Sequence, residues 1–169
     1  MDEHFDVLVS PDDNYLTHSG GAAAALWKNA ELILGESQRE EASQLGLSDV
    51  FVSRSGELNS LCLFHGITVD LKTNETISAS QAENLYKNIF EKASEIGLDT
   101  VALPLVGAGA GGLGTAGSTV ALAKAINASP TMPATIRLVV LERDYSKVKG
   151  LFIERLGSYL SWDEISFLL

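Results

Sequence analysis

The sequence predicts a three-layer α/β/α fold, with a central mixed, mostly parallel sheet and helices on both faces. β-branched apolar runs alternate with helical segments along the 169 residues, and this alternation is typical of such a sheet. The length and an apolar content of 46% suffice for one buried core, so a single domain over residues 1–169 is expected. Two loops of unusual composition follow predicted strands, at the sheet edge where such folds bind ligands.

The first strand is predicted over residues 5–10, FDVLVS, because a continuous apolar run indicates a strand buried on both faces. A polar loop follows, and alanine and leucine then favour a helix over about residues 20–34. Gly35 interrupts that helix. The charged segment 36–46 is typical of a solvated turn or helix that ends at its terminal glycine.

The middle of the chain predicts two strands and a long helix. Residues 49–53 and 60–70 are apolar runs separated by the turn RSGELN. Apolar side chains recur at helical spacing over residues 80–96, which predicts an amphipathic helix that Gly97 ends. Its expected buried face comprises Leu85, Ile89, Phe90, Ala93 and Ile96.

The remaining sequence continues the alternation of strands and helices. Residues 100–106 form a core strand, residues 107–117 a glycine-rich loop and residues 118–127 a helix. A strand over 135–142 and a helix over about 145–160 complete the fold, and residues 158–169 are a C-terminal extension.

Composition argues against several classes of function. A net charge of −10, with no clustered lysine and arginine, argues against a nucleic-acid surface. The uncharged segment 100–123 holds Pro104 and six glycines, so it does not predict a membrane span. No signal peptide opens the chain, and the lone Cys62 is expected to be a buried thiol in a reducing compartment. A cytoplasmic protein is therefore expected.

The first unusual loop lies between the first predicted strand and the first predicted helix. Asp12, Asp13 and Asn14 precede Ser19 and a pair of glycines that opens the helix. Free N–H groups and the helix dipole favour negative charge there, and backbone amides bind phosphate without any side-chain charge. The stretch predicts that an anionic or sugar-like group is held at this helix start.

The second loop carries glycines at positions 107, 109, 111, 112 and 114. Glycines at this density let the backbone approach a ligand closely and adopt positive φ angles. Facing one crevice, the two loops would suit a diphosphate held mainly by main-chain amides. Tight helix–strand packing without a ligand is the alternative explanation.

Two other nucleotide-binding motifs fit this loop less well. Gly107, Gly109 and Gly112 match the dinucleotide fingerprint G-x-G-x-x-G, but that motif needs an acid about 20 residues later. The next predicted strand ends at Glu142, which is too far along the chain. A P-loop requires a lysine after its glycines, and none follows here.

Taken together, the two loops resemble the motifs of the macro domain, a family that binds ADP-ribose and its derivatives. The stretch DVLVSPDDNYLTHSGGAAAAL lines up without a gap, from Asp6 to Leu26, with the family's first motif. That motif reads D-A-I-V-N-A-A-N and then, after a short loop, a glycine run and V-D-G-A-I. VALPLVGAGAGGLG resembles the later motif, a Phe-Pro strand and a glycine loop, from Pro104 to Gly112. The element order agrees, so the resemblance covers nearly the whole chain.

The resemblance implies that backbone amides of both loops contact a diphosphate. The residues so implicated are Ser19, Gly20, Gly21 and Ala22, and Gly107, Ala108, Gly109, Ala110, Gly111 and Gly112. Three positions near the distal ribose depart from the hydrolytic members. Asp13 stands in place of an asparagine, with Asn14 one position late, Ala23 in place of an acid, and Gly111 in place of an aromatic residue. The diphosphate site is thus retained, whereas the usual hydrolytic apparatus is not.

The polar side chains before the glycine pair are hypothesised to contact the distal ribose. Asp12, Asp13 and Asn14 would hydrogen-bond its hydroxyls, and Gly111 would leave room for a further group on that sugar. The alternative is that the two aspartates only cap and order the loop. His18 is a further candidate to donate to a phosphate or sugar.

The adenine end of the ligand has no familiar counterpart, because the chain starts five residues before Asp6 and lacks the strand whose acid recognises adenine. Glu142 and Tyr145 are candidates to contact or stack on adenine, with ordinary packing as the alternative for Tyr145. The abrupt start suggests a domain cut from a longer protein or abbreviated naturally. The histidines lack metal-ligand spacing, no metal site is expected, and His65 is expected to be a hydrogen-bonded core residue.

The resemblance implies a sensor: a module that binds ADP-ribose or an ADP-ribose-derived signal and regulates a fused or partner effector, as in anti-phage defence. The alternative is an ADP-ribosyl hydrolase with Asp13 as general base. A dinucleotide oxidoreductase ranks third. No cofactor beyond the ligand and no contact with nucleic acid or membrane are expected, and homo-oligomer formation is left open.

Overall fold

One mixed sheet forms the centre of the molecule in the computed structural model, which describes residues 3–31 and 33–156. Its described strands are β1 (Phe5–Asp13), β2 (Val50–Arg54), β3 (Ser60–Asp70), β4 (Glu75–Thr76), β5 (Thr100–Pro104) and β6 (Thr135–Val139). Their order is β2-β3-β1-β5-β6, and β4 pairs with β3 outside this path. β3, β1, β5 and β6 run parallel, whereas β2 and β4 pair antiparallel with β3.

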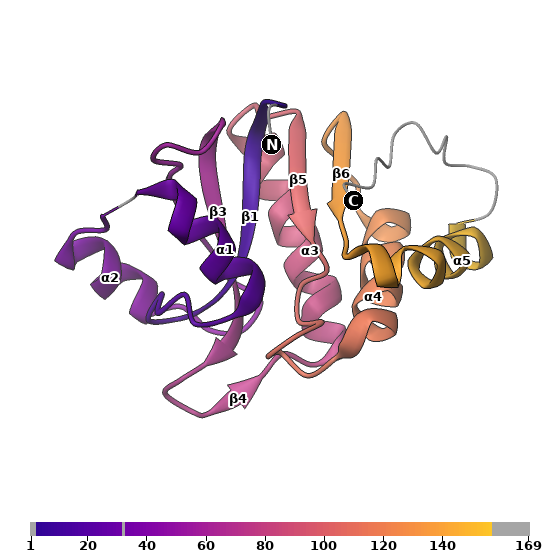
Figure 1. The fold of residues 1–169 in the computed structure, drawn as a ribbon, viewed down its shortest axis with the longest axis horizontal. Coiled ribbons are helices and arrows are strands. Elements are labelled where there is room, and N and C mark those ends of the chain that lie inside the picture. Colours follow the sequence, from indigo (N-terminus) through magenta and orange to yellow (C-terminus); the bar gives the residue numbers. More distant parts are fainter. Residues whose placement is uncertain (1–2, 32, 157–169) are drawn as a thin grey trace.

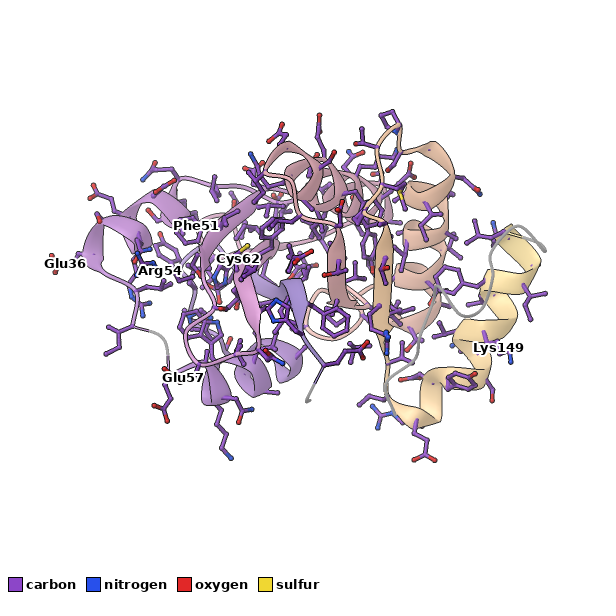
Figure 2. All side chains as sticks on the ribbon, turned by 90° about the horizontal axis from the view of Figure 1, so that it is seen from above. Glu36, Phe51, Arg54, Glu57, Cys62 and Lys149 are labelled. Atoms are coloured by element: carbon purple, nitrogen blue, oxygen red, sulfur yellow. The ribbon has the colours of Figure 1, made fainter. Side chains whose placement is uncertain are left out.

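Helices cover both faces of this sheet (Figure 1). On one face lie α1 (Gly21–Ala30) and α2 (Glu36–Ser43); on the other lie α3 (Ala79–Glu95), α4 (Gly114–Ala128) and α5 (Tyr145–Leu156), the last preceded by the 3-10 turn η1 (Glu142–Asp144). Glu36 of α2 and Lys149 of α5 lie at opposite ends of the molecule (Figure 2). The predicted three-layer α/β/α architecture is confirmed.

The largest described core lies between the sheet and α3, α4 and α5. Val7 and Val9 of β1 face it and join a buried cluster that includes Phe90 of α3 and Phe152 of α5. On the opposite face, Leu8 packs in a second cluster against Trp27 of α1. β1 is buried on both faces and runs to Asp13 and not to residue 10, so Asp12 and Asp13 belong to the strand and not to the loop after it.

The long helix α3 confirms the predicted amphipathic pattern. Ser78 and Gln81 form a capping box at its start, in which each side chain satisfies the other residue's backbone amide. Gly97, with φ of +71°, ends it, as expected. Leu85 to Ala93 supply the buried face. Ile96 was expected on that face, but it follows the last helical residue and is 49% exposed.

Other element boundaries differ from the expected ones for identifiable reasons. The first helix ends at Ala30 and not at residue 34, because Glu31 takes a left-handed conformation with φ of 45°. α4 begins at Gly114 and not at residue 118, since packing against the core overrides the low helix propensity of its glycines. β6 ends at Val139, so Glu142 lies in η1 and not at a strand end.

Two further expectations concern the burial of Cys62 and the end of the last helix. Cys62 on β3 is only half-buried, not buried as expected, and burial and the charge of Asp6 raise the pKa of its thiol. α5 begins at Tyr145 as predicted, whereas its expected end near residue 160 and the extension over 158–169 lie outside the described residues. No described helix is long and apolar enough to span a membrane.

Candidate functional site

The candidate site residues gather at the carboxyl edge of the sheet, around β1 and β5. These two strands are parallel neighbours, with Val7 paired to Val101 and Leu8 paired to Ala102. The chain leaving β1 returns through β2 and β3 on one side, and the chain leaving β5 returns to β6 on the other. Connections that diverge in this way leave a crevice outside the strand ends, which is where open α/β sheets bind ligands. Both glycine loops lie at this carboxyl edge of the sheet (Figure 1).

The first loop delivers the open amino end of α1 to this edge. Gly20 is the N-cap residue and offers no side-chain cap, and a Cβ placed on Gly20 or Gly21 would meet no atom within 4 Å. Among the described residues, no acceptor takes a hydrogen bond from the backbone amides of residues 19–23. Unpaired amides at a helix start, together with the helix dipole, form an anion-binding position.

The second loop, residues 105–113, is folded by its own backbone. The amides of Ala108, Gly112 and Leu113 donate to the carbonyls of Leu105, Gly109 and Gly107, at 3.2, 3.0 and 2.9 Å. Within the described part of the chain, the amides of residues 109–111 donate to no acceptor. A Cβ at Gly109 would meet no atom within 4 Å. The second loop therefore presents another run of unpaired amides, which is exposed at Gly109 and Ala110.

Gly111 is glycine for a reason that the sequence does not reveal. A Cβ at this position would lie 2.5 Å from the Cα of Gly107, a contact that real side chains do not make. The loop turns back on itself here, so it has no space for a side chain of any size. The turn itself requires the glycine, and the room that Gly111 leaves for a further group on the ligand stays a prediction.

A buried phenol holds the start of the second loop. The Oη of Tyr86, on α3, accepts the amide of Val106 at 2.9 Å and lies 2.8 Å from the Oγ of Ser118 on α4. Burial raises the pKa of this phenol, which keeps it neutral. Sequence analysis missed Tyr86 because it lies within an apolar helical stripe. Its hydroxyl was the available signal, since buried tyrosines usually have a hydrogen-bond partner.

The carboxylate of Asp13, at the end of β1, is occupied by donors of the loop that follows. It accepts the amide of Tyr15 at 2.9 Å, the amide of Thr17 at 3.2 Å and the hydroxyl of Thr17. Asp13 is 6% exposed. These contacts are the Asx-type ordering that the sequence offered as the alternative role, and a contact with a ribose hydroxyl stays a prediction.

Asn14 ties the first loop to the turn between β3 and β4. Its Nδ2 donates to Asp70 at 2.8 Å, and its Oδ1 accepts the amide of Leu71 at 3.0 Å. The side chain is fully buried. Like Asp13, it shapes the loop in this structure, and its predicted contact with a sugar stays a prediction.

Asp12 lies at the centre of a buried polar network beneath α1. One carboxylate oxygen accepts a hydrogen bond from Nδ1 of His65 at 2.8 Å, and the other accepts one from Nδ1 of His18 at 3.0 Å. Burial alone would raise the pKa of Asp12, but these hydrogen bonds and the charge of His65 outweigh it and lower the pKa to about 2. The expectation that His65 is a hydrogen-bonded core residue is confirmed, because its Nε2 also lies 2.8 Å from the Oγ of Ser53.

The candidate adenine residues follow β6 at the same edge of the sheet. Glu142 is exposed, whereas Tyr145 packs partly against the main core. The Nζ of Lys149 lies over the ring of Tyr145, 5.8 Å from its centroid. Thr115 donates to Asp144 at 3.2 Å and so connects the start of α4 to η1. Contact of Glu142 and Tyr145 with adenine stays a prediction. The described residues contain no group of three or more His, Cys, Asp or Glu side chains that could hold a metal ion.

The amino-acid sequence is similar to those of known proteins. A family model described as "Macro domain" matches residues 9–122. A protein of Pyrobaculum aerophilum is 27% identical over 158 residues, which cover 89% of this chain and 85% of that protein. A protein of Mycobacterium tuberculosis is 30% identical over 112 residues, which cover 63% of this chain and 29% of that protein.

Solved structures share the fold at low sequence identity. A macrodomain of Oceanobacillus iheyensis with ADP superposes with a TM-score of 0.71 at 18% identity, covering 91% of this chain and 84% of that chain. A macrodomain of Trypanosoma brucei in complex with ADP-ribose gives a TM-score of 0.67 at 13% identity, covering 91% and 64%. These likenesses establish a common architecture.

Proposed function

The chain belongs to the macro domain family, and from that premise we propose that it binds ADP-ribose or an ADP-ribose-derived nucleotide. The diphosphate would lie between the two loops, held by the amides of residues 19–23 on one side and of residues 109–111 on the other. The solved macrodomains with ADP and with ADP-ribose support this choice of ligand.

The observation that carries the proposal is the pair of unpaired amide runs in the segments that follow two neighbouring strands. The first run is open at Gly20 and Gly21 and the second at Gly109, and both lie at the divergence of the chain between β1 and β5. Amides that donate to nothing in the protein are available to an anion at no cost in broken hydrogen bonds. A net charge of −10 is compatible with such a site, since the backbone supplies the donors.

We further propose that the module is a sensor, which reports the ligand to a fused or partner effector, with anti-phage signalling as one setting. The state of Asp13 supports binding over hydrolysis. A general base needs a free lone pair directed at water, and this carboxylate accepts three donors from its own loop. Ala23 and Gly111, where hydrolytic members carry an acid and an aromatic residue, support the same choice.

Calorimetric titration with ADP-ribose tests the proposal, with chromatography of the recovered ligand to detect cleavage. We expect saturable binding and intact ligand. ADP-ribose derivatives extended at the distal ribose form the second set of titrants, because the family's usual aromatic cover is replaced there. Absence of binding to ADP-ribose and to every derivative would reject the proposed function, and release of ADP-ribose from a derivative by hydrolysis would reject the sensor in favour of a hydrolase.

A further inference from the structure

A chain of buried hydrogen bonds runs across the sheet and ends in the first loop. It connects Ser53 of β2, His65 of β3, Asp12 of β1 and His18 of the loop, through contacts of 2.8, 2.8 and 3.0 Å. Ser53, His65 and Asp12 are each at most 6% exposed. Four separate segments of the sequence therefore meet in one polar network on the face of the sheet that α1 covers.

The protonation states in this network follow from its chemistry. A carboxylate with a lowered pKa is ionised at neutral pH and can only accept, so both histidines donate to Asp12 through Nδ1–H. The donor on His18 is therefore fixed at Nδ1. A hydrogen bond to a buried ionised carboxylate is stronger than one between two uncharged groups.

His18 also has an uncommon backbone and a defined ring position. Its φ is 55°, in the left-handed region that residues other than glycine seldom occupy. Its ring stacks on Trp27 of α1, with the ring centroids 3.5 Å apart and the planes at 22°. A residue is held in a sparsely populated conformation only when its surroundings over-determine it, and here Asp12 and Trp27 grip its ring.

The next residues along the chain, 19–23, are the ones whose amides are unpaired. We propose that His18 is a positioning residue: its hydrogen bond to Asp12 sets the backbone direction of residues 19–22 and so aims their amides at the diphosphate. This inference rests on the proposed function for its ligand. The geometric part, that the Asp12–His18 contact orders the loop, can be tested without any ligand.

Two substitutions at this position separate the hydrogen bond from the shape of the side chain. In His18→Asn, the Nδ2 occupies nearly the place of the histidine Nδ1, so the donor to Asp12 is kept, and asparagine tolerates the left-handed backbone. His18→Leu has nearly the same branched shape without a donor. Both variants remove the stack on Trp27. They differ in the donor to Asp12 and in their tolerance of the positive φ at this position, so equal behaviour of the two excludes a role for the hydrogen bond. His18→Ala is a second variant without a donor, for use if the leucine variant does not fold.

The first measurement is the 15N relaxation order parameter of the amides of residues 19–22 in the free protein. We expect order parameters of about 0.85 in the wild type and in His18→Asn, and order parameters below about 0.6 in His18→Leu or His18→Ala. The second measurement is calorimetric affinity for ADP-ribose. We expect the donor-less variants to bind about tenfold more weakly, the factor that corresponds to loss of one hydrogen bond to a charged group, and His18→Asn to stay near the wild type.

Equal order parameters in the asparagine and leucine variants, whether both rigid or both mobile, would overturn the inference, because the Asp12 contact would then make no difference to the loop. A rigid loop in wild type and His18→Asn that binds no ADP-ribose would reject the proposed function and leave the ordering role of His18 standing. Ordered amides in every variant together with unchanged affinity would overturn the positioning role directly.

Discussion

The phenol oxygen of Tyr86 accepts a hydrogen bond from the backbone amide of Val106 at 2.9 Å, and this contact joins α3 to the start of the second loop. The same oxygen lies 2.8 Å from Ser118 on α4. One side chain therefore holds the chain both before and after the glycines of this loop. The loop can stay open to a ligand at Gly109 while its two ends are fixed.

Replacing Tyr86 with phenylalanine tests this bracket. The buried amide of Val106 and the hydroxyl of Ser118 would each lose a partner, so we expect the free energy of unfolding to fall by about 1–3 kcal/mol. Urea denaturation measures the change. Tyr15→Phe is the matched control, because Tyr15 is 43% exposed and the same oxygen is removed. Equal effects of the two substitutions would contradict a special role for Tyr86.

Substituting Gly109 with glutamate should abolish ADP-ribose binding and leave the fold intact. The new Cβ would enter open space, so no steric cost is expected, whereas the carboxylate would repel the diphosphate. Calorimetry measures the affinity and circular dichroism the fold. Gly150→Glu adds the same charge at an equally open position on α5 and should bind normally. Unchanged affinity in a folded Gly109→Glu variant would mean that this loop does not hold the phosphates.

Alanine at Gly111 should lower the stability of the protein, whereas alanine at Gly109, two residues away, should leave it nearly unchanged. At Gly111 the methyl would lie 2.5 Å from the Cα of Gly107, and we expect a loss of about 1–3 kcal/mol in unfolding free energy, as for overpacked sites. At Gly109 the methyl meets nothing, and we expect a change within about 0.5 kcal/mol. Thermal and urea unfolding compare the two. Similar stabilities would show that the turn tolerates a side chain.

The network around Asp12 predicts a specific dependence of stability on pH. The pKa of this carboxylate is lowered to about 2 in the folded protein from an ordinary 3.8. Its ionised form therefore stabilises the fold above the ordinary value, and that contribution is lost as the pH falls toward 2. The difference of roughly two pKa units corresponds to about 2 kcal/mol.

Asp12→Asn isolates this contribution from that of other carboxylates. We expect the stability gap between wild type and variant to narrow by about 2 kcal/mol as the pH is lowered from about 5 to about 2. Urea denaturation at a series of pH values measures the gap. A gap that stays constant over this range would show that the histidine contacts do not hold the carboxylate ionised.

Two substitutions at Asp13 test whether this residue orders the first loop. Asp13→Asn keeps an oxygen for the amides of Tyr15 and Thr17, and we expect its stability to stay within about 0.5 kcal/mol of the wild type. Asp13→Ala removes the acceptor from all three donors, and we expect a loss of about 1–2 kcal/mol. Urea denaturation compares them. A stable alanine variant that has lost ADP-ribose affinity would favour a direct ligand contact instead.

The amino-acid sequence by itself determined the order of strands and helices and the place of both glycine loops. These features depend on local patterns: the apolar run of β1, the helical spacing of α3 and the glycine that ends it. Local patterns also placed the candidate loops after β1 and β5, so the carboxyl edge could be identified. Boundaries such as the start of α4 at Gly114 could not, because packing decided them.

Only the tertiary structure decided what the polar residues at the end of β1 and near the loops do. Asp12 bonds to His65, which is 53 positions away, and Tyr86 reaches Val106 from a different layer of the fold. Position 111 must be glycine because a Cβ there would collide with the backbone of Gly107, and no periodic pattern in the sequence predicts this turn. A polar side chain in a loop can serve a ligand or its own backbone with the same atoms, and its choice depends on which donors the folded chain brings within about 3 Å.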